Sequence, residues 1–418
     1  MSQAKTITQR SLAPGSRLPG VQAKSVGLHP LLYRKRLDRV DREARPGDLV
    51  EVYGGDGNLA GYGLFNPKAE LALRMLSGAD ELPDEAFWKR KLEQAVELRR
   101  TVLRLDEASD SYRVVHAEAD GLSGLVIDKL GDVLSVECFT PGMYERAQAI
   151  VELLAPLVGT KHWIVRPGPA TLPQEGFDGP VLASPQCPSR VTIQEFGTRF
   201  RVDFAEGHKT GFFCDQRDNR RMLASFCKDK TVLDLCCYTG GFAIQAKKLG
   251  GASDVIGIDL DEAPLALARE NANLNQVRVK FVQADSFAYL RDMLANGRRF
   301  DVVVLDPPKL IRSRAELEEG TRKHFDLNRL AMRLVAPGGI MLTCTCAGLL
   351  SPDEFLRMVY SSARQAGDEV SPATADSYAR HAPRHVQILA KTGAAPDHPV
   401  AANCPETEYL QAIWMRVM

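Results

Sequence analysis

The spacing of apolar and polar residues divides the chain into a strand-rich front part and a back part where strands and helices alternate. In residues 46–67, apolar and polar positions alternate on both sides of a Gly-Gly-Asp-Gly turn, which is typical of a β-hairpin. Residues 17–78 as a whole are rich in short strand patterns, so we expect a small β-barrel domain there. Residues 82–104 instead carry apolar side chains at helical spacing, which predicts an amphipathic helix.

Residues 79–205 are predicted to form an α+β middle domain. Strands are expected near 112–116, 125–128 and 133–138, then a helix at 144–157 and a strand at 162–166. Two further strands, near 191–195 and 198–204, lead into the back part. The stretch 167–188, rich in proline and glycine, is expected to be a long loop.

Residues 206–418 show strand–helix alternation. Apolar strands are predicted at 231–238, 254–259, 279–285, 300–306 and 339–346, with helices between them. This alternation favours an α/β doubly wound, Rossmann-like parallel sheet with helices on both faces. The segment between the expected strands 386–391 and 410–416 has no helical periodicity in its apolar residues, so a terminal antiparallel hairpin is expected. That combination is typical of the class I methyltransferase version of the fold.

Size and composition agree with a globular protein of two or three domains. The chain has 418 residues, of which 44% are hydrophobic and 25% charged. It contains no apolar run long enough to span a membrane, so we expect a cytoplasmic protein with no membrane partner. None of the nine cysteines belongs to a CxxC pair or has zinc-site spacing, which favours reduced thiols and no metal.

Charge is balanced overall but not locally. The formal net charge is zero, yet residues 1–45 hold ten basic and three acidic side chains. Such an excess attracts phosphates, and it makes Arg34 and Lys35 candidates for substrate contacts. The alternative is a solvated arm, and residues 1–16 in particular are expected to be a loose tail.

Polar residues at the strand ends of the back part predict a nucleotide-like cofactor. Gly240 lies in the turn after strand 231–238, where the backbone can approach a ligand. Asp259 follows Gly241 by 18 residues and is placed to accept both hydroxyls of a ribose. Asp285 and Ser286 are placed to contact an adenine edge. Acids lie at or near four strand ends, namely Asp234, Asp259, Asp285 and Asp306. This acidic rim repels a pyrophosphate and suits S-adenosylmethionine, although some of these acids could instead be helix N-caps.

Residues 306–309, Asp-Pro-Pro-Lys, are predicted to form the substrate end of the site. Two prolines make a stiff loop without backbone donors, so Asp306 and Pro307 offer acceptors to an exocyclic amine or a ring N–H of a base. Lys309 adds a positive charge. Because amino-methyltransferases also use such a loop, it does not specify the atom that is methylated.

Two cysteines, Cys344 and Cys346, occupy one face of the strand at 339–346. Residues i and i+2 of one strand are poorly placed for a disulfide. We interpret Cys344 as core packing. Cys346 lies at the carboxyl end beside the expected cofactor, where a thiolate has a chemical use: its addition to carbon 6 of a pyrimidine activates carbon 5 for methylation.

The motifs together resemble a known family. DQRDNR (215–220), VLDLCCYTGGFA (232–243), VIGID, FDVVVLDPPK and LTCTCAG are similar to the bacterial 23S ribosomal RNA 5-methylcytosine methyltransferases. GLHPLLYRK (27–35) and PGDLVEVY resemble the PUA RNA-binding domain of that family. The resemblance covers about residues 17–418 and is weakest at 167–188. It implies that Cys346 is the nucleophile and that Asp215, Gln216 and Asp259 hold S-adenosylmethionine. Tyr238, which lies in the matching run VLDLCCYTGGFA, is a further candidate cofactor contact.

One departure concerns the release of the product. Many two-cysteine RNA methylcytosine enzymes carry a releasing thiol directly after D-x-P, but here Pro308 and Lys309 follow. Another group must therefore act as the base.

The hypothesis is an S-adenosylmethionine-dependent RNA cytosine-5 methyltransferase that acts on 23S ribosomal RNA through Cys346 and Asp306. The first alternative is amino-group methylation of RNA at the Asp306-Pro307-Pro308 loop, which would not need Cys346. The second is a non-catalytic RNA-binding assembly factor. A homodimer is an open alternative to a monomer.

Overall fold

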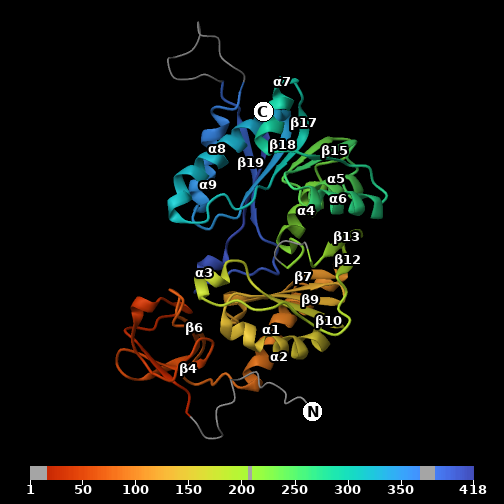
Figure 1. The fold of residues 1–418 in the computed structure, drawn as a ribbon. Coiled ribbons are helices and arrows are strands. Elements are labelled where there is room, and N and C mark those ends of the chain that lie inside the picture. Colours follow the sequence, from red (N-terminus) through yellow and green to blue (C-terminus); the bar gives the residue numbers. More distant parts are fainter. Residues whose placement is uncertain (1–16, 206–209, 368–381) are drawn as a thin grey trace. The chain divides into compact units, whose positions relative to one another are not determined.

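The computed structural model describes residues 17–205, 210–367 and 382–418, so the predicted tail at 1–16 lies outside the described residues. The chain forms two compact units (Figure 1). Unit 1 comprises Met1–Gln194, Val202–Cys214 and Pro396–Thr407, and unit 2 comprises Glu195–Arg201, Asp215–Ala395 and Glu408–Met418. The division at residues 78 and 205 that we expect from the sequence stays a prediction.

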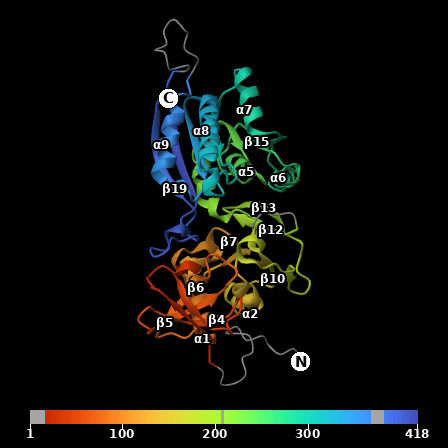
Figure 2. The same ribbon diagram turned by 60° about the vertical axis from the view of Figure 1, so that its left-hand side comes forward.

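The first sheet of unit 1 has six strands in the order β2-β6-β5-β4-β1-β3. The strands are β1 (Gly20–Ala23), β2 (Leu31–Leu32), β3 (Leu37–Val40), β4 (Leu49–Tyr53), β5 (Leu59–Phe65) and β6 (Leu73–Gly78). Strands β4 and β5 pair antiparallel, which confirms the predicted hairpin (Figure 2). Val21, Val50, Val52 and Leu73 are fully buried in its core.

The second sheet of unit 1 has five strands in the order β11-β10-β9-β8-β7. They are β7 (Ser111–His116), β8 (Leu125–Leu130), β9 (Val133–Cys138), β10 (His162–Pro167) and β11 (Leu182–Ala183). Helices α1 (Glu85–Glu97) and α2 (Pro141–Val158) share one apolar core with this sheet. Asp84 and Thr140 accept hydrogen bonds from backbone N–H groups as N-caps of the two helices. The strands and helices predicted at 82–166 are thereby confirmed, although α1 ends in a π-helical turn at Leu98–Val102.

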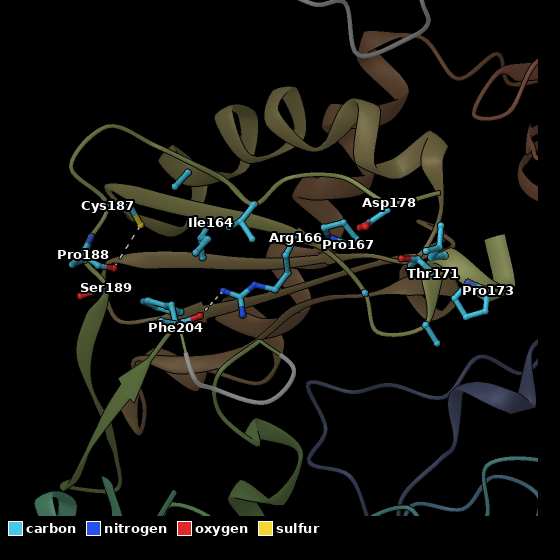
Figure 3. A pocket seen from close by; sticks show the side chains of 16 residues that line it. Ile164, Arg166, Pro167, Thr171, Pro173, Asp178, Cys187, Pro188, Ser189 and Phe204 are labelled. Atoms are coloured by element: carbon cyan, nitrogen blue, oxygen red, sulfur yellow. Dashed lines mark hydrogen bonds between the residues drawn. The ribbon is translucent and has the colours of Figure 1, made fainter. Parts of the chain in front are cut away.

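The expectation of a plain loop at 167–188 is wrong. The segment contains the short helix α3 (Thr171–Glu175), and β11 pairs antiparallel with β10. A cavity of about 700 Å³ lies beside this segment, with Arg166 and prolines among its lining residues (Figure 3). Arg166 Nη2 donates to the carbonyl oxygen of Phe204 at 3.1 Å. Strand pairing of only two residues has no clear periodic pattern, which explains why the sequence did not reveal it.

A buried polar cluster explains why residues 396–407 belong to unit 1. The guanidinium of Arg99 is fully buried and donates to both carboxylate oxygens of Asp120, at 2.6 and 2.9 Å. Arg99 also donates to the carbonyl oxygen of Asp397 at 2.7 Å, and Asp397 Oδ2 accepts the Arg113 backbone N–H at 2.8 Å. The rings of His116 and His398 lie edge to face, 5.2 Å apart.

Unit 2 is built on a seven-stranded sheet in the order β16-β15-β14-β17-β18-β20-β19. The strands are β14 (Thr231–Leu235), β15 (Asp254–Asp259), β16 (Lys280–Gln283), β17 (Phe300–Leu305), β18 (Val335–Thr345), β19 (Val386–Gly393) and β20 (Gln411–Val417). The first five are parallel, and β20 is antiparallel to both β18 and β19. The predicted parallel sheet and its terminal antiparallel hairpin are confirmed. Strands β12 (Arg190–Glu195) and β13 (Thr198–Asp203) form a separate two-stranded sheet.

Helices cover both faces of the large sheet (Figure 1). One apolar cluster joins it to α7 (Ser286–Ala295), α8 (Leu317–Leu334) and α9 (Pro352–Ala363). The other joins it to α4 (Arg217–Ala224) and α5 (Gly241–Lys248), and α6 (Glu262–Leu274) lies beside α5. Short 3-10 helices span Arg34–Arg36, Leu105–Glu107, Ala117–Asp120, Cys214–Gln216, Arg314–Glu316 and Pro405–Thr407. Within the described ranges, every helix is too short or too polar to cross a membrane.

Candidate active site

The turn between β14 and α5 is held in an unusual backbone conformation. Cys236, Tyr238 and Gly240 have φ angles of 61°, 49° and 81°. A Cβ atom on Gly240 would lie 3.0 Å from the Phe281 ring and 3.1 Å from Ile244. The Tyr238 backbone N–H donates to Asp259 Oδ2 at 2.8 Å, which fixes the turn at its centre. The glycine that the sequence singled out is therefore required by both conformation and space.

Asp234 is a buried carboxylate with an unsatisfied oxygen. Its side chain is fully buried in β14, and Oδ2 accepts the Ala243 backbone N–H at 2.9 Å. Oδ1 has no hydrogen-bond partner among the described residues. Burial raises the pKa of Asp234 well above its usual range, and the nearby Asp306 and Asp259 carboxylates raise it further. The site therefore favours an added positive group next to Asp234.

The acids at the next two strand ends make local backbone bonds. Asp259 accepts backbone N–H groups at both oxygens, from Tyr238 at 2.8 Å and from Asp261 at 3.1 Å. Asp285 Oδ1 accepts the Ala288 N–H at 3.0 Å as the N-cap of α7, as the alternative interpretation of the rim foresaw for some acids. Ser286 Oγ lies 3.4 Å from Cys236 Sγ, so this residue faces the glycine turn.

The DQRDNR run brings two expected site residues to the sheet edge. Asp215 Oδ2 accepts the hydroxyl of Tyr409 at 2.6 Å. Gln216 is 3% exposed, and its Nε2 donates to Asp306 Oδ2 at 3.0 Å. The structure thus joins Gln216 directly to the Asp-Pro-Pro-Lys loop, whereas the family resemblance implies a role at the cofactor.

The two cysteines of β18 differ in accessibility. Cys344 is fully buried, while Cys346 is half-buried and packs against the same apolar cluster just beyond the strand end. Burial raises the pKa of the Cys344 thiol well above its usual value, Asp306 raises it further, and a hydrogen bond from Gln216 opposes the shift. All nine cysteines lie within the described residues and carry reduced thiols.

A buried histidine lies next to the segment that carries Cys346. His324 Nε2 on α8 lies 3.2 Å from the hydroxyl of Thr345. Thr345 Oγ1 also accepts the Ala347 backbone N–H at 3.2 Å. Burial lowers the pKa of His324 to about 4, so the ring is neutral at physiological pH. These contacts hold the residues on both sides of Cys346.

The remaining expected substrate residues lie in two places. Pro307 is buried, and Lys309 is exposed beyond it in unit 2. Arg34 and Lys35 belong to unit 1, where they form an exposed basic 3-10 helix. Arg34 donates through Nε and Nη2 to the carbonyl oxygen of Ala69, at 3.2 and 2.9 Å.

Several residues that the sequence did not single out complete this site. In the sequence, Asn219 and Arg220 are considered only as part of the DQRDNR motif, without a role of their own. Asn219 Nδ2 donates to Gln216 Oε1, and Arg220 forms a buried ion pair with Glu195 at 2.7 Å. Tyr409 and His324 had no local signal, because strand order and helix packing alone bring them to the site. Helical spacing from Gln216 could have suggested Asn219.

One group of potential metal ligands lies outside this site. His29, Cys404 and Glu406 of unit 1 offer donor atoms within 4.8 Å of one another. However, His29 Nδ1 accepts the Leu31 backbone N–H at 3.2 Å, so a neutral ring carries its proton on Nε2 and donates it to Glu406 at 3.1 Å. The arrangement fits a hydrogen bond better than a metal site.

The strand-end residues fit S-adenosylmethionine. The unsatisfied oxygen of Asp234 and its two neighbouring carboxylates, Asp259 and Asp306, suit a ligand with positive charge and no phosphate. Asp259 and Ser286 stand at the ends of the adjacent strands, as the sequence predicts for ribose and adenine contacts. These assignments remain predictions for the individual residues.

Two family models match the chain. A model of S-adenosylmethionine-dependent methyltransferases matches residues 115–369, and a model of PUA-like domains matches residues 19–78. The first spans more than half of the chain. Together they confirm the predicted fold class and the predicted cofactor.

Named relatives and solved structures point the same way. A protein of Aliivibrio fischeri (strain MJ11) named ribosomal RNA large subunit methyltransferase I is 34% identical over 396 residues, which cover 93% of this chain and 96% of that protein. The protein of the same name from Aeromonas salmonicida (strain A449) is 35% identical and covers 93% and 95%. Two solved structures share the fold. One, from Streptococcus mutans, has a TM-score of 0.75 at 17% identity and covers 95% and 100%. The other, complexed with SAH, has a TM-score of 0.76 at 18% identity and covers 95% and 99%.

Proposed function

We propose that this chain, which belongs to the S-adenosylmethionine-dependent methyltransferase family, methylates carbon 5 of a cytosine in large-subunit ribosomal RNA. Two things support an RNA substrate: the names of relatives that match almost the full chain, and the PUA-like domain at residues 19–78. The choice of carbon 5 rests on the residues of the site.

The observation that carries the proposal is the contrast between the two cysteines. Cys344 has no exposed surface, so it cannot reach a substrate, whereas Cys346 is half-buried at the carboxyl edge of the sheet. Ligands of such sheets bind at this edge. An amino-methyltransferase has no need of an accessible thiol there.

The reaction that we infer uses covalent activation. The Cys346 thiolate adds to carbon 6 of the cytosine, and the electron pair of the 5,6 double bond moves to carbon 5. Bound S-adenosylmethionine supplies the electrophilic methyl group. After carbon 5 carries the methyl group, a base removes its proton, the double bond reforms and the Cys346 thiolate leaves. Asp306 holds the base edge of the cytosine during these steps.

The cofactor and RNA contacts follow from the predicted residues. Asp234 faces the positive part of the cofactor, Asp259 its ribose, and Asp285 and Ser286 its adenine. We assign RNA backbone contacts to the basic 3-10 helix with Arg34 and Lys35, because side chains of this kind bind phosphates without reading sequence.

The test is a covalent trap. Full-length protein is incubated with S-adenosylmethionine and large-subunit ribosomal RNA transcripts that contain 5-fluorocytidine. Fluorine cannot leave as a proton does, so a stable protein–RNA adduct should form, and peptide mapping should place it on Cys346. The Cys346→Ala variant should lose both adduct and methylation.

Cys344→Ala is the matched control, since it removes a thiol from the same strand. It should keep adduct and methylation, with a stability loss of about 1 kcal/mol from the small cavity. An adduct on Cys344 would overturn the assignment. Methylation of an exocyclic amine by the Cys346→Ala protein would favour the amino-methylation alternative.

A further inference from the structure

A chain of four hydrogen bonds runs from the terminal hairpin of unit 2 to Asp306. Trp414 Nε1 lies 3.0 Å from Thr392 Oγ1, and Thr392 Oγ1 lies 2.7 Å from Asn219 Oδ1. Asn219 Nδ2 lies 2.7 Å from Gln216 Oε1, and Gln216 Nε2 lies 3.0 Å from Asp306 Oδ2. We call these five residues the relay. Trp414, Asn219 and Gln216 are at most 3% exposed, so water does not compete for most of these bonds.

The direction of every bond in the relay is fixed by chemistry. An indole N–H can only donate, so Thr392 Oγ1 accepts from Trp414 and has its own proton left for the oxygen of Asn219. The amide nitrogen of Asn219 must then face Gln216. A second contact agrees, because Asn219 Nδ2 also lies 3.2 Å from the carbonyl oxygen of Gly393, which can only accept.

The same logic fixes Gln216. Its oxygen accepts from Asn219, so its nitrogen donates to Asp306 Oδ2. A donor at this oxygen stabilises the ionised form of the carboxylate, and any proton that Asp306 takes up must sit on Oδ1.

This bond opposes other charges around Asp306. Among the described residues, the titratable groups that interact with it include Asp234 on β14, Cys236 in the glycine turn and Cys344 on β18. Asp259 and Asp215 lie in the same cluster. Repulsion among these acids favours protonation of one of them, whereas the Gln216 donor favours Asp306 as the one that stays ionised.

We propose that the relay keeps Asp306 an ionised hydrogen-bond acceptor, so that the site selects a pyrimidine with an exocyclic amine over one with a carbonyl at the same position. Gln216, Asn219, Thr392 and Trp414 are positioning residues for this selection. The inference rests on the proposed function, since it concerns how the same site recognises cytosine. It assigns Gln216 to base selection rather than to the cofactor.

Gln216→Glu tests the proposal, because it replaces the donor that faces Asp306 by an acceptor and keeps the oxygen that faces Asn219. The introduced carboxylate and Asp306 would then have to share one proton, which is lost as the pH rises. Methylation of cytidine-containing ribosomal RNA should fall as pH rises from 6 to 8, to about tenfold below wild type at pH 8, which is the scale of losing one charge-assisted hydrogen bond. The wild-type rate should not fall over this range.

The second readout is selectivity. RNA with 5-fluorouridine at the target position carries a carbonyl in place of the exocyclic amine. The ratio of adduct formation with 5-fluorocytidine RNA to that with 5-fluorouridine RNA should be smaller in Gln216→Glu than in wild type, again by about tenfold. Asn219→Asp should change pH profile and ratio in the same direction, because an acceptor at this position turns the Gln216 amide around. The Asn219→Asp variant replaces Gln216→Glu in both tests if Gln216→Glu does not fold. Gln365→Glu, an exposed glutamine just after α9, is the matched charge control and should behave as wild type.

The outcomes separate the two proposals. Absence of cytosine-5 methylation by the wild-type protein would refute the proposed function. If the wild-type protein is active and both relay variants have the same pH profile and selectivity ratio as the wild type, only the relay proposal is overturned. A loss of S-adenosylmethionine affinity in Gln216→Glu that matches its loss of activity would also overturn it, since Gln216 would then be a cofactor contact.

Discussion

Replacing Gly240 by alanine should damage the site in two separable ways. The first is conformational, because alanine at a φ of 81° costs about 1–2 kcal/mol. The second is steric, because the new Cβ would lie 3.0 Å from the Phe281 ring and 3.1 Å from Ile244. Crowding of this kind in a packed interior costs about 1–3 kcal/mol. We therefore expect Gly240→Ala to lower the free energy of unfolding of unit 2 by about 2–5 kcal/mol.

Gly251→Ala isolates the conformational part. Gly251 has a φ of 66°, and a Cβ there would meet nothing within 4 Å. Its loss should be about 1–2 kcal/mol, with unchanged affinity for S-adenosylmethionine. Gly240→Ala should weaken that affinity at least about tenfold, since its turn carries the Tyr238 bond to Asp259 and a shift of about 1.4 kcal/mol suffices.

Denaturant titration followed by tryptophan fluorescence measures the stability loss, and calorimetry measures cofactor binding. Phe281→Leu removes the closest ring atom, so the double variant with Gly240→Ala should lose less than the sum of the two single losses. If Gly240→Ala were no more costly than Gly251→Ala, or if Phe281→Leu showed no coupling, the close packing of this turn would be refuted.

Four further variants test other parts of the protein. At pH 7, Asp234→Asn should raise the melting temperature of the protein without cofactor. Folding raises the pKa of Asp234, so its ionisation destabilises the folded state once the pH exceeds the pKa of the unfolded state, whereas asparagine does not ionise. The same variant should abolish S-adenosylmethionine binding, and an unchanged affinity would argue against a cofactor contact of Asp234. Asp259→Ala should weaken the same binding by about 1.5–3 kcal/mol in calorimetry. Since the pKa of His324 is lowered to about 4, the free energy of unfolding should fall by up to about 3 kcal/mol as the pH drops from 6.5 to 4. Denaturant titrations at several pH values should show a smaller fall for His324→Gln. Lys35→Ala with Arg36→Ala should weaken RNA binding and reduce its salt slope by about 2, while unchanged slopes would assign the basic helix another task.

Local patterns in the sequence predicted the framework well for physical reasons. A parallel strand buried on both faces leaves a continuous apolar run, and each run in residues 231–345 marks a strand of the sheet. The carboxyl ends of such strands share one edge, so Asp234, Asp259 and Cys346 could be placed near each other before any coordinates. The terminal hairpin followed from the lack of a helical pattern between its strands.

Contacts between distant segments could not be predicted in this way. The relay joins positions 216 and 219, which are three residues apart, to positions 306, 392 and 414, and no short-range pattern links these last three to the first two or to one another. His324 meets Thr345 only because α8 packs on the sheet. The short strand β11 has two residues, too few for a period to register.

The inclusion of residues 396–407 in unit 1 has a consequence for the order in which the protein can mature on the ribosome. The chain passes between the units five times. Its last return to unit 1, at residues 396–407, brings the carbonyl oxygen of Asp397 to the buried guanidinium of Arg99. When the first 200 residues have emerged from the exit tunnel, this cation still lacks one of its acceptors, and the Arg113 amide lacks its carboxylate. Unit 1 can therefore reach its final stability only after residues 396–407 have emerged. A stalled or prematurely terminated product would expose an incomplete front half to proteases, and expression of residues 1–205 alone would yield a destabilised fragment rather than an independent RNA-binding module.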